Sequence, residues 1–131
     1  MDWSALESAA RAVLPHAHAP YSRFPVAAAV LFADGGIEAG VNVENASFPL
    51  SACAERNALA AGVRSGRGQI QAVLILTGAE APTPPCGGCR QVLAEFGGPA
   101  VVVRSLTLEG RSDEHTLGAL LPQAFGPDSL L

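Results

Sequence analysis

Extended and helical patterns alternate along this 131-residue chain, and their order restricts the fold more than any other feature of the sequence. Two apolar runs, residues 26–32 and 37–43, flank an Asp-Gly-Gly turn signal at residues 34–36, which predicts a β-hairpin. Ser4 is the candidate N-cap of a first helix that ends before Pro15. The predicted elements are helix 4–14, the hairpin, helix 51–63, strand 70–76, helix 86–96, strand 100–106, strand 111–116 and helix 117–121.

This order predicts an α/β fold of three layers (α/β/α), with helices on both faces of a mixed five-stranded sheet. The turn signal Glu109–Gly110 makes the last strand return antiparallel at the edge of the sheet. Right-handed crossovers place both central helices on the same face. A chain of 131 residues is typical of one compact domain, so we expect residues 1–131 to form a single domain.

The composition predicts an ordered protein that associates with copies of itself. Hydrophobic residues make up 49% of the chain, which excludes intrinsic disorder because there is ample apolar surface to bury. Charged residues make up only 15%, whereas about 25% is typical. Such a small chain leaves apolar surface uncovered, so we expect a homo-oligomer. The alternative is a monomer whose surface consists of small residues.

Charge and hydropathy argue against nucleic acid or membrane partners. The net charge is −4, and all eight cationic residues are scattered arginines, whereas nucleic-acid interfaces concentrate cations on one face. The longest apolar run, residues 24–33, is much shorter than the roughly 20 residues of a membrane-spanning helix. The first residues lack the pattern of a signal peptide. We therefore expect a cytoplasmic protein.

Three cysteines carry the clearest chemical signal. Their odd number argues against a disulfide framework. Cys86 and Cys89 form a Cys-x-x-Cys motif at a helix start, which alone fits a redox pair, a zinc knuckle or chance burial. Cys53 opens the other central helix. Three thiolates bind Zn²⁺ and leave its fourth position open, which is typical of a catalytic site. We therefore predict one zinc ion per chain.

A closed structural site, completed by a histidine, is the alternative. The candidates are His16 and His18, in a proline-flanked connector, and His115, on the predicted edge strand. Solvated or capping roles suit these positions better than metal ligation.

Two charged residues next to Cys53 fit an open zinc site. Zinc lowers the pKa of a bound water towards about 7, and Glu55 is placed to accept its proton. Three thiolates make the centre anionic, and Arg56 is placed to donate to a sulfur and offset that charge. The alternatives are an ordinary glutamate in the first turn of a helix and a surface ion pair of Arg56.

Five motifs in this order resemble the small zinc-dependent cytidine deaminases, and the resemblance extends over roughly residues 5–128. The motifs are YSRFPV at 21–26, NVENAS at 42–47, CAER at 53–56, CGGCRQ at 86–91, and LLP at 120–122 followed by Phe125. The resemblance implies a cytidine deaminase-like fold and the hydrolytic deamination of cytidine and deoxycytidine to uridine and deoxyuridine, with release of ammonia, in pyrimidine salvage.

Residue by residue, the resemblance implies a zinc centre and a proton carrier. Cys53, Cys86 and Cys89 correspond to the zinc ligands of the family. Glu55 corresponds to the residue that delivers protons to N3 of the base and then to the departing ammonia. The family is homotetrameric, with active sites shared between subunits, so the same is implied here.

The resemblance also implies substrate contacts. Asn42 and Glu44 would bind the ribose 3′-hydroxyl, and their i, i+2 spacing at a strand end puts both side chains on one side, although a solvated strand end has the same pattern. Phe24 would pack against the base or sugar, and the Ala54 backbone would bind the pyrimidine carbonyl. Phe125 would reach the site of a neighbouring subunit. Without the resemblance, both phenylalanines would be assigned to the core.

Two positions depart from the family pattern. Phe48 stands where the family usually has tyrosine, so a hydroxyl contact near the 5′ end of the sugar is absent. Ala28 stands where glycine is usual and could crowd its strand. Two other functions compete with the implied one: deamination of another aminated nucleoside, of the antibiotic type, and a non-catalytic module stabilised by zinc.

Overall fold

The computed structural model describes all 131 residues and contains one five-stranded sheet in the order β2-β1-β3-β4-β5. The strands are β1 (Val26–Phe32), β2 (Ile37–Val41), β3 (Ile70–Thr77), β4 (Val102–Thr107) and β5 (Ser112–Thr116). The helices are α1 (Trp3–Val13), α2 (Ala54–Arg64), α3 (Gly87–Phe96) and α4 (Leu117–Leu120), with short 3₁₀ turns η1 (Leu14–His16), η2 (Phe48–Leu50) and η3 (Pro127–Ser129).

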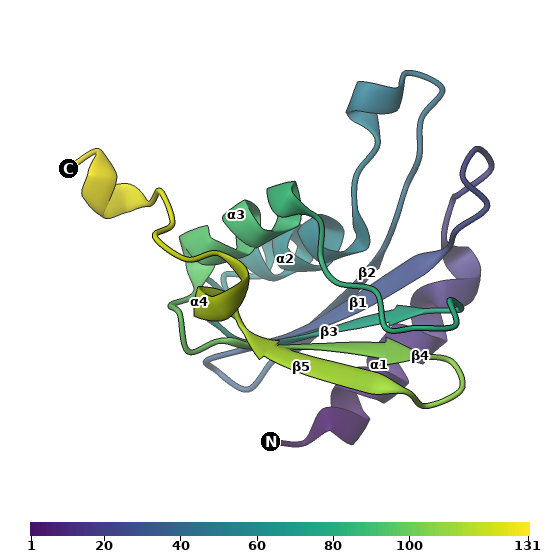
Figure 1. Cartoon of the computed structure of the whole chain (residues 1–131), viewed down its shortest axis with the longest axis horizontal. Helices are drawn as coiled ribbons and strands as arrows, with labels where there is room; N and C mark the ends of the chain where they lie inside the picture. Colours follow the sequence, from purple (N-terminus) through teal and green to yellow (C-terminus); the bar gives the residue numbers. More distant parts are fainter.

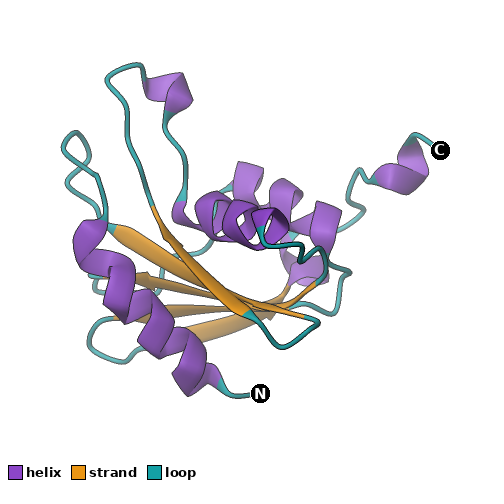
Figure 2. Cartoon of the chain, turned by 180° about the vertical axis from the view of Figure 1, so that it is seen from behind, coloured by secondary structure: helices purple, strands orange, loops and turns teal.

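Helices cover both faces of the sheet, as predicted. Helix α1 lies on one face, and α2, α3 and α4 lie on the other (Figures 1 and 2). Only β3 and β4 run parallel; every other neighbouring pair is antiparallel, including the last pair, β4 and β5. The mixed sheet, the three layers and the antiparallel last strand are therefore confirmed.

The core consists of two apolar clusters on opposite sides of the sheet. The larger cluster packs α2 and α3 against β1, β3 and β4, and the smaller packs α1 against the reverse side of the same strands. Seven of the eight residues of β3 are buried because this strand is covered on both faces. Edge strand β5 is exposed throughout and carries polar side chains, which protects the edge from pairing with other chains.

Helix α2 lies unusually close to the edge strand β2. A Cβ atom built on Gly40 would lie 2.4 Å from the amide nitrogen of Ala58 and 2.8 Å from the carbonyl oxygen of Ala54. Only glycine permits this approach, which sets the position of the helix that carries Glu55.

Local details differ from the sequence predictions at three element ends. The N-cap of α1 is Asp2, whose carboxylate accepts a hydrogen bond from the Ser4 amide, so Ser4 is not the cap. The second hairpin strand ends at Val41 rather than residue 43. Helix α2 begins at Ala54 rather than residue 51, because the backbone of Ser51 and Cys53 is extended.

Two segments extend away from the sheet. The connection between β2 and α2, which carries η2, projects at one side of the molecule, and the chain after α4 projects at another (Figure 1). Both carry exposed apolar side chains, among them Phe48 (68% exposed) and Phe125 (58% exposed). The longest helices, α1 and α2, have 11 residues each, and none of the helices qualifies as a membrane span.

Candidate metal centre and adjoining pocket

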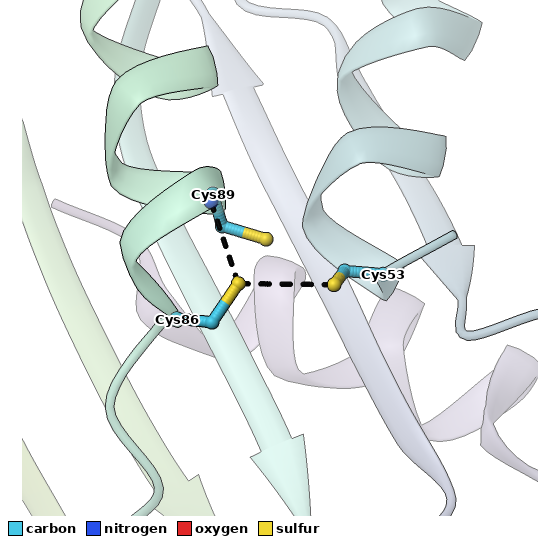
Figure 3. Close-up of side chains that lie close together, drawn as sticks. All are labelled: Cys53, Cys86 and Cys89. Carbon is cyan, nitrogen blue, oxygen red and sulfur yellow. Dashed lines mark hydrogen bonds between the residues drawn. The ribbon is translucent and has the colours of Figure 1, made fainter. Parts of the chain in front are cut away.

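Three cysteine sulfurs converge at the starts of α2 and α3. Cys53 is the N-cap residue of α2, Cys86 is the N-cap residue of α3, and Cys89 lies in the first turn of α3 (Figure 3). The sulfurs of Cys53 and Cys86 are 3.9 Å apart, and all three sulfurs lie within 4.8 Å of one another. The fold thus unites residues that are 33 positions apart in the sequence.

This geometry fits a zinc ion. Tetrahedral zinc with Zn–S bonds of about 2.3 Å places its sulfur ligands roughly 3.8 Å apart. The cysteines are all free, and they form the only group of three or more His, Cys, Asp or Glu residues with ligand atoms this close together. No histidine belongs to the group: His16 and His18 are exposed, and His115 pairs with Asp113. The alternative of a histidine-completed site therefore finds no support.

The thiols differ in their electrostatic environments. Burial raises the pKa values of Cys53 and Cys89. Burial also acts to raise the pKa of Cys86, but hydrogen bonds, first among them the one from the Cys89 amide, outweigh it and lower this pKa. Cys86 is thus the thiol that ionises most readily, and the two others require a cation to displace their protons.

A pocket of about 250 Å³ opens beside the sulfurs. Its wall includes Cys53, Cys86 and the adjacent Glu55, which is only 5% exposed. Burial raises the pKa of the Glu55 carboxyl, which favours a group that gains and loses a proton. A metal centre, a buried carboxyl and a cavity for a small molecule therefore occupy one place.

Three of the predicted substrate-binding residues line the same pocket: Phe24, Asn42 and Ala54. Four other residues of the wall were not predicted from the sequence: Val26, Ile75, Thr83 and Pro84. Thr83 and Pro84 lie shortly before the Cys-x-x-Cys motif, separated from it by Pro85, and this proximity was the signal available for these two residues. Val26 and Ile75 lie on strands β1 and β3, whose apolar sequence does not distinguish a pocket wall from core.

Asn42 holds the segment that carries Phe24. Its side-chain oxygen accepts from the Val26 amide at 2.9 Å, and its side-chain nitrogen donates to the Phe24 carbonyl at 2.9 Å. These two bonds fix the backbone on both sides of Pro25.

Glu44 and Phe48 line a neighbouring pocket rather than the one beside the sulfurs. This second pocket also includes Tyr21, Ser22 and Ser51. The Glu44 carboxylate accepts hydrogen bonds from the Tyr21 and Ser22 amides and from the Ser22 hydroxyl. Phe48 packs edge-on against Tyr21, with ring centroids 5.7 Å apart. Asn42 and Glu44 thus both point to the segment 21–26, in accordance with their i, i+2 spacing.

Arg56 has an incomplete set of hydrogen bonds. One of its terminal nitrogens donates to the Ser51 carbonyl at 2.8 Å, whereas its Nε is buried and has no partner. It forms no ion pair, so the surface-pair alternative is not what the structure contains. This buried donor without an acceptor lies in the first turn of α2, three residues after Cys53, and fits an interaction that forms when the thiols ionise.

The remaining predicted positions lie outside the pocket. Phe125 is in the projecting C-terminal segment, where its carbonyl accepts from the Gln91 side chain at 2.8 Å. Ala28 is fully buried in the core cluster under α2.

Comparisons with known proteins agree with this site. The family model described as the cytidine and deoxycytidylate deaminase zinc-binding region matches residues 3–105. Cytidine deaminases of Sporosarcina psychrophila and Mycobacterium tuberculosis are 39% and 41% identical to the chain over 130 residues, which cover 99% of it and 96% and 94% of the relatives.

A solved structure has the same fold. The crystal structure of cytidine deaminase from Burkholderia pseudomallei superposes with a TM-score of 0.90 at 42% identity, over 95% of this chain and all of the other. An open, three-cysteine metal centre on a mixed sheet places the chain in the class of zinc-dependent deaminases. Within that class, the chain belongs to the cytidine and deoxycytidylate deaminase family.

Proposed function

We propose that this protein deaminates cytidine and deoxycytidine hydrolytically, giving uridine or deoxyuridine and ammonia, in pyrimidine salvage in the cytoplasm. The observation that carries the proposal is the buried Glu55 carboxyl in the wall of a pocket that also contains the sulfurs of Cys53 and Cys86. A structural zinc site needs neither the carboxyl nor the pocket.

The three cysteine thiolates would hold one zinc ion per chain, which when bound supplies an activated water near neutral pH. Glu55 accepts a proton from the attacking water and delivers it to N3 of the base as the C4–O bond forms. It then transfers the second proton of that water to the amino group, and the C4–N bond breaks to release ammonia. Burial suits Glu55 to this cycle because the raised pKa brings the carboxyl nearer to neutral pH.

Arg56 supports the thiolates rather than the substrate. Its unpartnered Nε is available to donate to an ionised sulfur, which would offset the negative charge of three thiolates. The Ser51 carbonyl holds the guanidinium in place for this contact.

Phe24, Asn42 and the Ala54 backbone line the substrate pocket and would contact the nucleoside. Glu44 and Phe48 lie in the adjacent pocket, so we assign them to the sugar end of the substrate. Phe125 is exposed and does not line the pocket beside the sulfurs, and we propose a homotetramer in which this side chain completes the site of a neighbour.

An ultraviolet assay of cytidine conversion tests the proposal. Wild-type protein with zinc is expected to convert cytidine and deoxycytidine, whereas Glu55→Gln retains one zinc per chain and loses at least about 100-fold in turnover, as expected for a general acid–base residue. Glu95→Gln, an exposed glutamate of α3, is the matched control and should keep full activity.

Two results would contradict the proposal. One is a Glu55→Gln variant that keeps its rate. The other is a wild-type protein that leaves both nucleosides unchanged but deaminates a different aminated nucleoside, which would favour the antibiotic-type activity.

A further inference from the structure

The side chain of Arg90, the residue after Cys89, donates hydrogen bonds to two backbone carbonyls, one five residues before it and one 30 residues after it. Its Nε donates to the Pro85 carbonyl at 2.9 Å, and one terminal nitrogen donates to the Leu120 carbonyl at 2.9 Å. The side chain is half-buried and forms no ion pair with an acidic residue. The guanidinium of Arg90 therefore forms hydrogen bonds to backbone carbonyl oxygens and not to a carboxylate.

The first of these bonds closes a loop around the two sulfurs of α3. Pro85 directly precedes Cys86, so a bond from Arg90 to its carbonyl fixes the peptide from which the Cys86 side chain departs. Cys86 needs this support because it is exposed, whereas Cys89 is buried. The Cys86 sulfur itself accepts only a long hydrogen bond of 3.4 Å from the Cys89 amide and lies 3.9 Å from the Cys53 sulfur.

The second bond joins this loop to the last helix. Leu120 is the final residue of α4, and carbonyls at a helix end lack partners within the helix. Arg90 satisfies one of them, and the next residue, Gln91, donates to the Phe125 carbonyl at 2.8 Å. Arg90 and Gln91, the two residues after Cys89, thus connect α4 and the C-terminal segment by hydrogen bonds to residues 85–89, which we call the metal loop.

We propose that Arg90 is a positioning residue, which holds the Cys86 thiolate in place for the metal and couples the metal loop to the C-terminal segment. The proposal relies on zinc binding as part of the proposed function, but it does not require deamination. It differs from the role of Arg56 because Arg90 acts on the backbone and contacts no sulfur.

Zinc release into a colorimetric chelator tests this role without a substrate. Arg90→Met keeps much of the side-chain length and removes both donors. We expect it to release zinc about 10–100-fold faster than wild type, the usual effect of losing a residue that supports a metal ligand. Arg90→Lys can satisfy one carbonyl at a time, so its rate should lie between the two.

Arg104→Met is the matched control. Arg104 is also half-buried, but it packs over the Trp3 ring on the opposite face of the sheet, so its loss should leave zinc release unchanged. Cobalt-loaded proteins give a second readout: the thiolate-to-cobalt absorption should change in Arg90→Met and stay the same in Arg104→Met.

Release from Arg90→Met within threefold of the Arg104→Met rate would overturn the proposal, and faster release supports it. Urea unfolding of metal-free Arg90→Met and Arg104→Met shows whether a general loss of stability explains a difference in zinc release. Equal free energies of unfolding with unequal release rates support the positioning role. Release rates that follow the free energies of unfolding overturn it. If Arg90→Met does not fold, Arg90→Lys is judged by the same threshold. A wild-type protein that binds zinc but leaves cytidine unchanged would refute the proposed function and leave this test intact.

Discussion

Two glutamates near the site have opposite environments. Burial is the main cause that raises the pKa of Glu55, whereas hydrogen bonds from Ser22 are the main cause that lowers the pKa of the half-buried Glu44. The first environment favours a carboxyl that exchanges protons, and the second favours a permanent carboxylate that accepts hydrogen bonds. Local contacts therefore give the same residue type two different roles.

The Glu44–Ser22 contact predicts a pH-dependent contribution to stability. Because the pKa of Glu44 is lower in the folded state than in the unfolded state, the contribution is complete above the unfolded value of about 4.3 and is lost as the pH falls through the folded value. We expect Ser22→Ala to be less stable than wild type at neutral pH, with the difference narrowing as the pH falls below the unfolded value of about 4.3.

Urea unfolding of metal-free protein at several pH values measures this difference. Ser8→Ala, at an exposed position of α1 that forms no side-chain hydrogen bond, should show no such pH dependence. A deficit of Ser22→Ala that stays constant down to acidic pH would count against the contact.

At the scale of elements, helix α2 is positioned by its contact with β2. Gly40→Ala would place a methyl group 2.4 Å from the Ala58 amide nitrogen, so either the helix or the strand must shift. We expect a loss of about 1–3 kcal/mol in the free energy of unfolding, as for other overpacked cores, together with reduced turnover because α2 carries Glu55.

Gly68→Ala is the control for that substitution. A Cβ atom at Gly68 would meet no atom within 4 Å, so this variant should unfold like wild type. Equal stability of the two variants in urea would show that the close approach of α2 to β2 is unimportant.

The elements were predictable from local signals, whereas the cysteine cluster also needed the right-handed crossovers that place both central helices on one face, together with the family resemblance. The apolar run of β1, the turn at Asp34–Gly35 and the cysteines at two helix starts are all readable without tertiary contacts. The hydrogen bonds of Arg90 were not predictable, because both acceptors are backbone carbonyls, which every residue has. Glu44 lines a different pocket from Asn42 because its carboxylate binds the amides of residues 21 and 22. The position of segment 21–26 next to Glu44 is also a tertiary property.

At the scale of the whole molecule, each of the two projecting segments carries an aromatic side chain that remains largely exposed, although Phe48 packs edge-on against Tyr21. Phe48 and Phe125 are 68% and 58% exposed, and the proposed tetramer would cover them. If Phe125 completes a neighbouring site, each site contains residues from two chains.

Mixing two impaired variants tests that sharing. Phe125→Ala subunits retain Glu55, and Glu55→Gln subunits retain Phe125, so some sites in a mixed oligomer contain both intact residues. We expect co-refolded mixtures to turn over cytidine faster than the sum of the separate variants. Rates that merely follow the proportions of the mixture would contradict a shared site.

The proposed activity depends on a metal ion bound by Cys53, Cys86 and Cys89. The most direct measurement is cytidine turnover recorded while zinc is removed by a chelator and then titrated back into the same sample. We predict that activity falls with the zinc content and returns in full at one equivalent per chain. Undiminished turnover by zinc-free protein, or full zinc occupancy without any turnover of cytidine, would contradict it.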